Sequence, residues 1–171
     1  MLRPHFFTLA FYTLFSLLFL TACNDAELTS HHSLSHIDRK STIAIYSMDN
    51  YTDTPHAGMR AANIAEGILL SKGYRVRSNI NITARPMTFS EKLANARRAG
   101  VRYMLTGGIS EWRYKTGIDG EPAVSLHLKL IDIAQGRIVW SATGSDSSWG
   151  NTSVGVVAQA LISRMLSVNP E

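Results

Sequence analysis

The chain has 171 residues, of which 45% are hydrophobic and 18% are charged, a composition that suits one globular domain and excludes a disordered or fibrous chain. The formal net charge is +4, but the 17 Lys and Arg residues are spread along the sequence and form no basic run of the kind that follows phosphates. We therefore expect no nucleic-acid partner.

The first 22 residues have the features of a bacterial export signal. Arg3 and His5 precede an apolar run from Phe6 to Leu20, which is too short to span a bilayer comfortably. The next segment, Leu-Thr-Ala-Cys, ends at Cys23 and resembles the lipobox of bacterial lipoproteins. Cys23 is the sole cysteine, so it cannot form an internal disulfide. An uncleaved anchor helix is the alternative, but the pattern favours a signal peptide over residues 1–22 and lipidation of Cys23.

The residues after the lipobox predict where the lipoprotein resides. Acyl chains on Cys23 contribute about 0.8 kcal/mol per buried methylene, enough for stable anchoring. Asn24 follows the cysteine, and by resemblance to the lipoprotein sorting rule the absence of Asp at this place favours the outer membrane, whereas Asp25 weakens that inference. We expect a lipid-anchored protein on the periplasmic face of the outer membrane.

The stretch from Asn24 to Lys40 is polar and has no sustained hydrophobic period, which predicts a flexible tether over residues 23–40. His31, His32 and His36 lie in it, but they lack Cys or carboxylate partners at ligand spacing. A solvated linker is favoured over a metal site, and a single domain is expected over residues 41–171.

The first half of this domain has a β-α-β-α pattern. Residues 42–46 form a β-branched and aromatic run typical of a buried strand, and the following apolar spacing predicts a helix over 56–72 that ends before Gly73. A second strand is expected at 74–76. Thr88 or Ser90 is then a candidate N-cap for a helix that ends before Gly100.

Three long strand-like segments follow, at residues 101–114, 123–133 and 137–145, with turn residues between them. They predict an antiparallel β-meander, and Val154, Val157, Leu161 and Met165 predict a closing amphipathic helix. The expected fold class is therefore α/β, with a mixed sheet, a C-terminal meander and helices packed on one face.

No catalytic constellation is present in the sequence. No serine lies in a Gly-x-Ser-x-Gly elbow, and Cys23 is consumed by the lipid, so we expect neither an enzyme nor a bound cofactor. Gly107 and Gly108 lack the Lys and Ser/Thr of a phosphate loop and favour a bulge or a close backbone approach.

A longer segment resembles a known family. Residues 108–115 (Gly-Ile-Ser-Glu-Trp-Arg-Tyr-Lys), 117–122 (Gly-Ile-Asp-Gly-Glu-Pro) and 136–141 (Gly-Arg-Ile-Val-Trp-Ser), together with Ser148-Trp149, are similar to PelC-type lipoproteins of Pel exopolysaccharide export. The resemblance covers roughly residues 40–168. It implies a fold similar to the TolB N-terminal domain and a ring-shaped homo-oligomer under the outer membrane, a dodecamer being one candidate size. It also implies a cationic exopolysaccharide, an outer-membrane export porin and a periplasmic scaffold as partners.

The same resemblance implies roles for individual residues. An acidic ring lumen would guide the cationic polymer, and Asp119 is the first candidate carboxylate, followed by Glu121 and Glu111. From the residues alone, these three acids are exposed turn charges, acid–base groups or ligand-steering charges.

The three tryptophans divide into two groups. Trp149 lies in a polar context beyond the last strand, so we expect it to face the membrane, with packing or a subunit contact as the alternative. Trp112 and Trp140 fall within expected strands and predict core or interface positions.

The main rival function is a lipoprotein activator of a penicillin-binding protein, a class that shares the lipobox, a polar linker and a TolB-like fold. Such activators reach through peptidoglycan on a long linker, whereas the tether expected here is only about 17 residues. A curli-type secretion lipoprotein is a third reading, but no spare lipid-facing strand is present in the sequence. The sequence thus favours the export ring.

Overall fold

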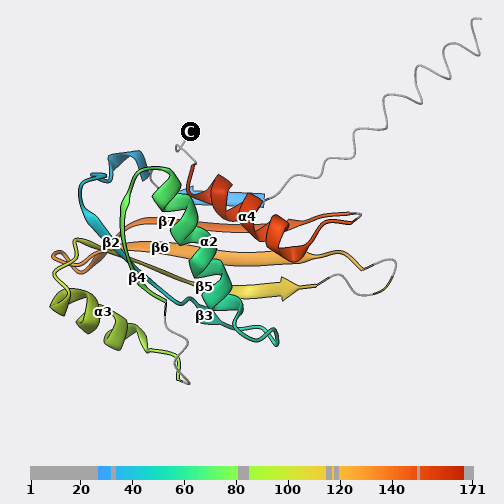
Figure 1. The fold of residues 1–171 in the computed structure, drawn as a ribbon, viewed down its shortest axis with the longest axis horizontal. Helices are drawn as coiled ribbons and strands as arrows, with labels where there is room; N and C mark the ends of the chain where they lie inside the picture. Colours follow the sequence, from blue (N-terminus) through green and yellow to red (C-terminus); the bar gives the residue numbers. More distant parts are fainter. Residues whose placement is uncertain are drawn as a thin grey trace, which may run out of the picture.

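The computed structural model describes residues 27–31, 34–80, 85–114, 117, 120–149 and 151–167, and these residues form a seven-stranded sheet with helices. The sheet order is β1-β7-β6-β5-β2-β4, and β3 pairs with β5 (Figure 1). The strands are β1 Glu27–His31, β2 Thr42–Tyr46, β3 Asp49–Asn50, β4 Arg75–Asn79, β5 Tyr103–Arg113, β6 Ala123–Asp132 and β7 Arg137–Ser147. The helices are the 3-10 turn η1 Leu34–His36 and the α-helices α2 Ala57–Ser71, α3 Phe89–Arg98 and α4 Val154–Met165.

The sheet has a parallel half and an antiparallel half. Strand β2 lies between β4 and β5 and runs parallel to both, while β5, β6 and β7 are paired antiparallel in sequence order. The expected mixed sheet with a C-terminal meander is confirmed. A register shift between Ile109 and Glu111 marks a bulge in β5, one residue beyond the Gly107-Gly108 pair.

Local sequence signals determine where the helices begin and end. Helix α2 ends before Gly73, which has a φ of 81° that a residue with a side chain rarely adopts. Of the two candidate caps of α3, Thr88 is the N-cap: its side chain accepts from the Glu91 N–H, and the Glu91 carboxylate accepts from the Thr88 N–H. The amphipathic pattern of the C-terminal helix is likewise confirmed by the burial of Val154, Val157, Leu161 and Met165 in α4.

Helices cover both faces of the sheet, so the prediction of helices on one face is wrong. Ile43 and Ile45 of β2 belong to the larger core beneath α2 and α4, which lie side by side in Figure 1. Ala44 and Tyr46 belong to a second core that includes Ala96 of α3. Because β2 is buried on both faces, its sequence is continuously apolar and does not reveal how many faces are covered.

The predicted tether over residues 23–40 is also wrong from Glu27 onward. Strand β1 pairs antiparallel with the edge of β7, from Glu27 opposite Ser145 to His31 opposite Ser141. Leu34 and Ile37 are buried in the larger core, and the Tyr74 hydroxyl donates to the Leu34 carbonyl oxygen at 3.2 Å. Backbone pairing to a sheet edge requires no apolar periodicity, which explains why the polar sequence did not predict it. Cys23 lies outside the described residues.

Among the residues that the structure describes, no helix is both long and apolar enough to cross a membrane.

Candidate functional site: the loop end of the sheet and a polar cluster on its open face

Three segments that the sequence analysis marked as functional meet at one end of the sheet. Ala123 pairs with Ser147 at the start of β6, and the Ser148 N–H donates to the Pro122 carbonyl oxygen at 3.2 Å. Glu27, the first residue of β1, pairs with Ser145, so β1 begins at the same end. We call this end, formed by residues 111–114, 120–123 and 145–149, the loop end.

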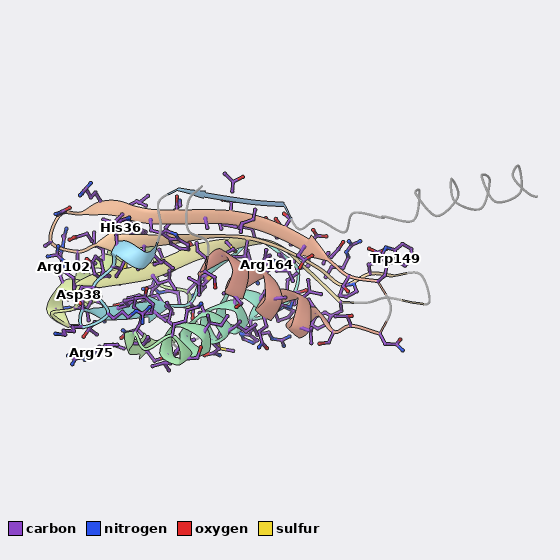
Figure 2. The ribbon with its side chains drawn as sticks, turned by 90° about the horizontal axis from the view of Figure 1, so that it is seen from above. His36, Asp38, Arg75, Arg102, Trp149 and Arg164 are labelled. Carbon is purple, nitrogen blue, oxygen red and sulfur yellow. The ribbon has the colours of Figure 1, made fainter. Side chains whose placement is uncertain are left out.

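Trp149 lies at the loop end and is 74% exposed, which agrees with the expectation that it is not a core residue (Figure 2). Trp112 and Trp140 are buried in the larger core, as predicted. Their indole N–H groups are buried without a hydrogen-bond partner in the described part of the chain. The exposure of Trp149 therefore sets it apart from the other two tryptophans.

Two of the three candidate carboxylates are described, and both belong to the loop end. Glu111 follows the bulge of β5 and its Oε1 lies 3.3 Å from Arg113 Nε, in a pair that is exposed on both sides. Such a pair contributes only about 0–1 kcal/mol, so Glu111 remains available to a ligand. Glu121 is partly exposed just before β6, and Asp119 lies outside the described residues.

The opposite end of the sheet is rich in arginine. Arg75 begins β4, Arg102 precedes β5, and Arg137 begins β7, while Arg97 and Arg98 end α3. Figure 2 shows Arg75 and Arg102 at one end of the molecule and Trp149 at the other. Of these five arginines, only Arg102 forms an ion pair in the described structure, with Asp132 at 2.7 Å. Five arginines thus lie at the end of the sheet away from the loop end, whereas the loop end has Arg113, which is paired with Glu111.

Other chemistry is sparse in the described residues. They contain no group of three His, Cys, Asp or Glu side chains arranged to hold a metal ion. The predicted close approach at the glycine pair is present, since a Cβ at Gly107 would lie 2.1 Å from the His127 carbonyl oxygen.

A cluster that the sequence analysis missed lies where β3 joins the sheet. Pairing of Asp49 with Gly108 brings Asp49 and Tyr51 beside His127 of β6. Burial lowers the pKa of His127, the positive charge of Lys129 lowers it further, and the Asp49 carboxylate acts in the opposite direction. The only sequence signals for this cluster are Gly108 and a short polar turn.

Comparison with solved structures identifies the family. PelC from Paraburkholderia phytofirmans, solved as a dodecamer, is 37% identical in sequence with a TM-score of 0.72, over 84% of this chain and 96% of that chain. The chain belongs to the PelC family. A variant of the same PelC, also solved as a dodecamer, gives 36% identity and a TM-score of 0.71.

The chain is also similar, more distantly, to other proteins. Residues 75–145 match the family model described as peptidoglycan-synthase activator LpoB. Lipoprotein GNA1162 from Neisseria meningitidis shares the fold at 19% identity, with a TM-score of 0.51 over 70% of this chain and 92% of that chain. TolB from Acinetobacter baumannii gives a TM-score of only 0.38, over 80% of this chain and 28% of that chain. No curated protein sequence matches the chain significantly.

Proposed function

We propose that this PelC family member is a non-enzymatic lipoprotein of Pel exopolysaccharide export, which forms a ring on the periplasmic face of the outer membrane and guides a cationic polysaccharide toward an export porin. The observation that carries the proposal is the 37% identity to a PelC that assembles as a dodecamer, over 96% of that chain. The porin and a periplasmic scaffold are the protein partners that this role requires.

The loop end is the part of the domain that we assign to the membrane. Glu27 is four residues from Cys23, a span that extended backbone limits to about 14 Å. A lipid on Cys23 would hold the loop end against the bilayer, and the exposed Trp149 would then enter the interface, where tryptophan is favoured. In a ring, every copy would add one lipid anchor and one indole to the same surface.

The carboxylates of the loop end are proposed to act together as an acidic rim of the lumen on the side that faces the membrane and the porin. Glu111 and Glu121 are partly exposed there, and Asp119 lies between them in sequence. A ring repeats each carboxylate around its axis, so that weak single contacts sum to a negative field that concentrates a polycation. Five arginines lie at the opposite end, and Arg113 of the loop end is paired with Glu111, so much of the net charge of +4 lies away from the free carboxylates or is compensated.

The central experiment replaces the loop carboxylate. In cells that depend on this chain for export, Asp119→Ala should lower the amount of secreted polymer, whereas Asp38→Ala, at an exposed acid at the opposite end of the domain, should not. The mature chain carrying Cys23→Ser should have the mass of a large discrete oligomer, and Asp119→Ala should leave that mass unchanged. Normal export by Asp119→Ala would remove the guiding role from this residue, and a monomer at every concentration would overturn the ring.

An activator of a peptidoglycan synthase is the second candidate, favoured by the match of residues 75–145 to the LpoB model. Strand β1 already begins at Glu27, four residues after Cys23, so the chain between a lipid on Cys23 and the domain is shorter than the sequence predicted and is too short to reach far through peptidoglycan. The two candidates separate in one assay. The assay measures glycan polymerisation by a purified penicillin-binding protein. If a monomeric form of this chain increases its rate, the activator is favoured.

A further inference from the structure

Two aromatic rings rest on a glycine on the face of the sheet opposite α2 and α4, which we call the open face because α3 covers only part of it. The Tyr51 N–H donates to the Ile109 carbonyl oxygen at 3.0 Å, which fixes the tyrosine beside β5. A Cβ at Gly108 would lie 2.7 Å from Tyr51 Cε2 and 2.6 Å from His127 Cε1, so only glycine lets both rings lie this close to the strand. Tyr51 is nevertheless 69% exposed, and it therefore presents apolar area to the solvent.

Beside this ring an exposed carboxylate is paired with a buried ammonium group, and Lys129 supplies a further positive charge near His127. Asp49 Oδ1 accepts from Lys92 Nζ at 2.7 Å, but the lysine side chain is only 3% exposed whereas the aspartate is 45% exposed. A molecule approaching from the solvent therefore meets the carboxylate and not the ammonium group. His127 adds little positive charge near neutral pH because burial and the Lys129 charge lower its pKa.

A small notch next to Asp49 contains polar groups with unused hydrogen-bonding capacity. Its volume is about 40 Å³, room for about one water or one hydroxyl group. The Ser47 Oγ that lines it is buried without a partner in the described structure, and the Lys92 ammonium has three N–H groups, of which one is bonded to Asp49. An unmet buried hydroxyl is costly, so a group that enters the notch would gain a hydrogen bond.

The position in the fold supports a binding role. The notch lies at the carboxyl ends of the parallel strands β2 and β4, and the helices that follow them, α2 and α3, pack on opposite faces of the sheet. Open parallel sheets bind ligands in the crevice at such a point. Next to it, His127 pairs with Thr143 of β7, and Thr143 pairs with Thr29 of β1.

His127, Thr143 and Thr29 thus form a row of polar side chains that crosses β6, β7 and β1. Neighbouring members of the row are separated by the inter-strand spacing of about 4.8 Å. That spacing is close to the length of one pyranose unit in an extended polysaccharide. A sugar chain lying across the strands would meet one polar side chain per unit, with Tyr51 at the end of the row.

We propose that Asp49, Tyr51, Gly108 and His127 form a binding subsite for one amino-sugar unit of a polysaccharide. The apolar face of the pyranose ring stacks on Tyr51, the ammonium substituent lies against the Asp49 carboxylate and the Tyr51 ring, and a sugar hydroxyl enters the notch at Ser47. This inference rests on the proposed function, because it assumes that a polymer passes the open face of the sheet.

The test measures binding of the full-length mature chain to immobilised glucosamine hexasaccharide, with maltohexaose, which lacks amino groups, as the comparison probe. Tyr51→Ala should weaken glucosamine hexasaccharide binding about tenfold, and Tyr51→Phe should retain it because the ring is kept. Ile138→Ala is the control, since Ile138 is an exposed apolar side chain next to Arg137, at the arginine-rich end of the sheet and outside the loop end. Asp49→Asn should abolish the preference for glucosamine over maltose units.

Two outcomes would overturn the subsite. One is binding by Tyr51→Ala that equals the binding of the unsubstituted chain. The other is a changed oligomeric mass in Tyr51→Ala, which would mean that a second copy of the chain covers this face. Failure of the proposed function has a different signature, because it appears as normal export from cells that lack the chain, whatever the purified protein binds.

Discussion

Lys92 Nζ lies 2.7 Å from Asp49 Oδ1, and this pair joins a buried ammonium to a half-exposed carboxylate. In the described structure Asp49 is the one carboxylate paired with Lys92. Asp49→Asn leaves a buried charge without its counter-ion and should lower the free energy of unfolding by about 2 kcal/mol. Asp49→Asn combined with Lys92→Met should recover most of that loss in urea denaturation. Losses that simply add in the double variant would contradict this coupling.

Two glycines of α2 should respond to alanine in opposite directions. A Cβ at Gly58 would lie 1.9 Å from the backbone oxygen of Met48, so Gly58→Ala forces β3 and α2 apart and should cost 3 kcal/mol or more, by order of magnitude. A Cβ at Gly67 would meet no other atom within 4 Å outside the helix backbone, so Gly67→Ala should stabilise the helix by about 0.5–1 kcal/mol. Thermal unfolding of the two variants measures both effects, and equal melting temperatures would refute the proposed packing of β3 on α2.

Substitutions of Trp149 and Trp140 should have different effects: the first should weaken membrane binding and the second should lower stability. Trp149→Ala removes an exposed ring and should change the free energy of unfolding by less than about 0.5 kcal/mol, while weakening flotation of the unlipidated mature chain with phospholipid vesicles. Trp140→Ala should cost about 3–5 kcal/mol because that ring is fully buried. Undiminished flotation by Trp149→Ala would exclude the membrane role.

His127 should make the protein less stable in mild acid. Its folded-state pKa is lowered from 6.5, mainly by burial, so the unfolded chain binds the proton more readily. The stabilisation is fully present above about pH 6.5 and is lost as the pH falls through the lowered pKa. His127→Gln should flatten the unfolding free energy measured between pH 7 and pH 5. An unchanged slope would assign the effect to other groups.

Glu91 should remain ionised far into the acid range. Its pKa is lowered to about 2, first by the hydrogen bond from Arg85 and then by those from the Thr88 backbone and side chain. The contribution of this capping box to stability is therefore present above pH 4.5 and is lost as the pH falls toward 2. NMR titration of the Glu91 carboxyl carbon checks the value. Arg85→Gln should raise the midpoint only part of the way to 4.5, because Thr88 still donates.

Patterns along the chain predicted much of the fold. Features that depend only on neighbours within a few residues were predicted correctly. They are the helix boundaries at Gly73 and Gly100, the cap at Thr88 and the alternating burial of the meander. The same local information predicted that Trp112 and Trp140 are buried and that Trp149 is exposed. The motif residues around 108–122 also sufficed to suggest the PelC family, which the comparison with the dodecameric PelC then confirmed.

Only the tertiary structure decided which distant residues become neighbours. The sequence of Glu27–His31 is polar, and it becomes an edge strand because β7 offers unpaired backbone groups, a property that no local pattern encodes. The placement of α3 opposite α2 follows from the crossover of β4 past β2 to β5. The same topology brings Asp49, Lys92 and His127 together over a span of 78 residues, because hydrogen bonds between strands act at any sequence separation.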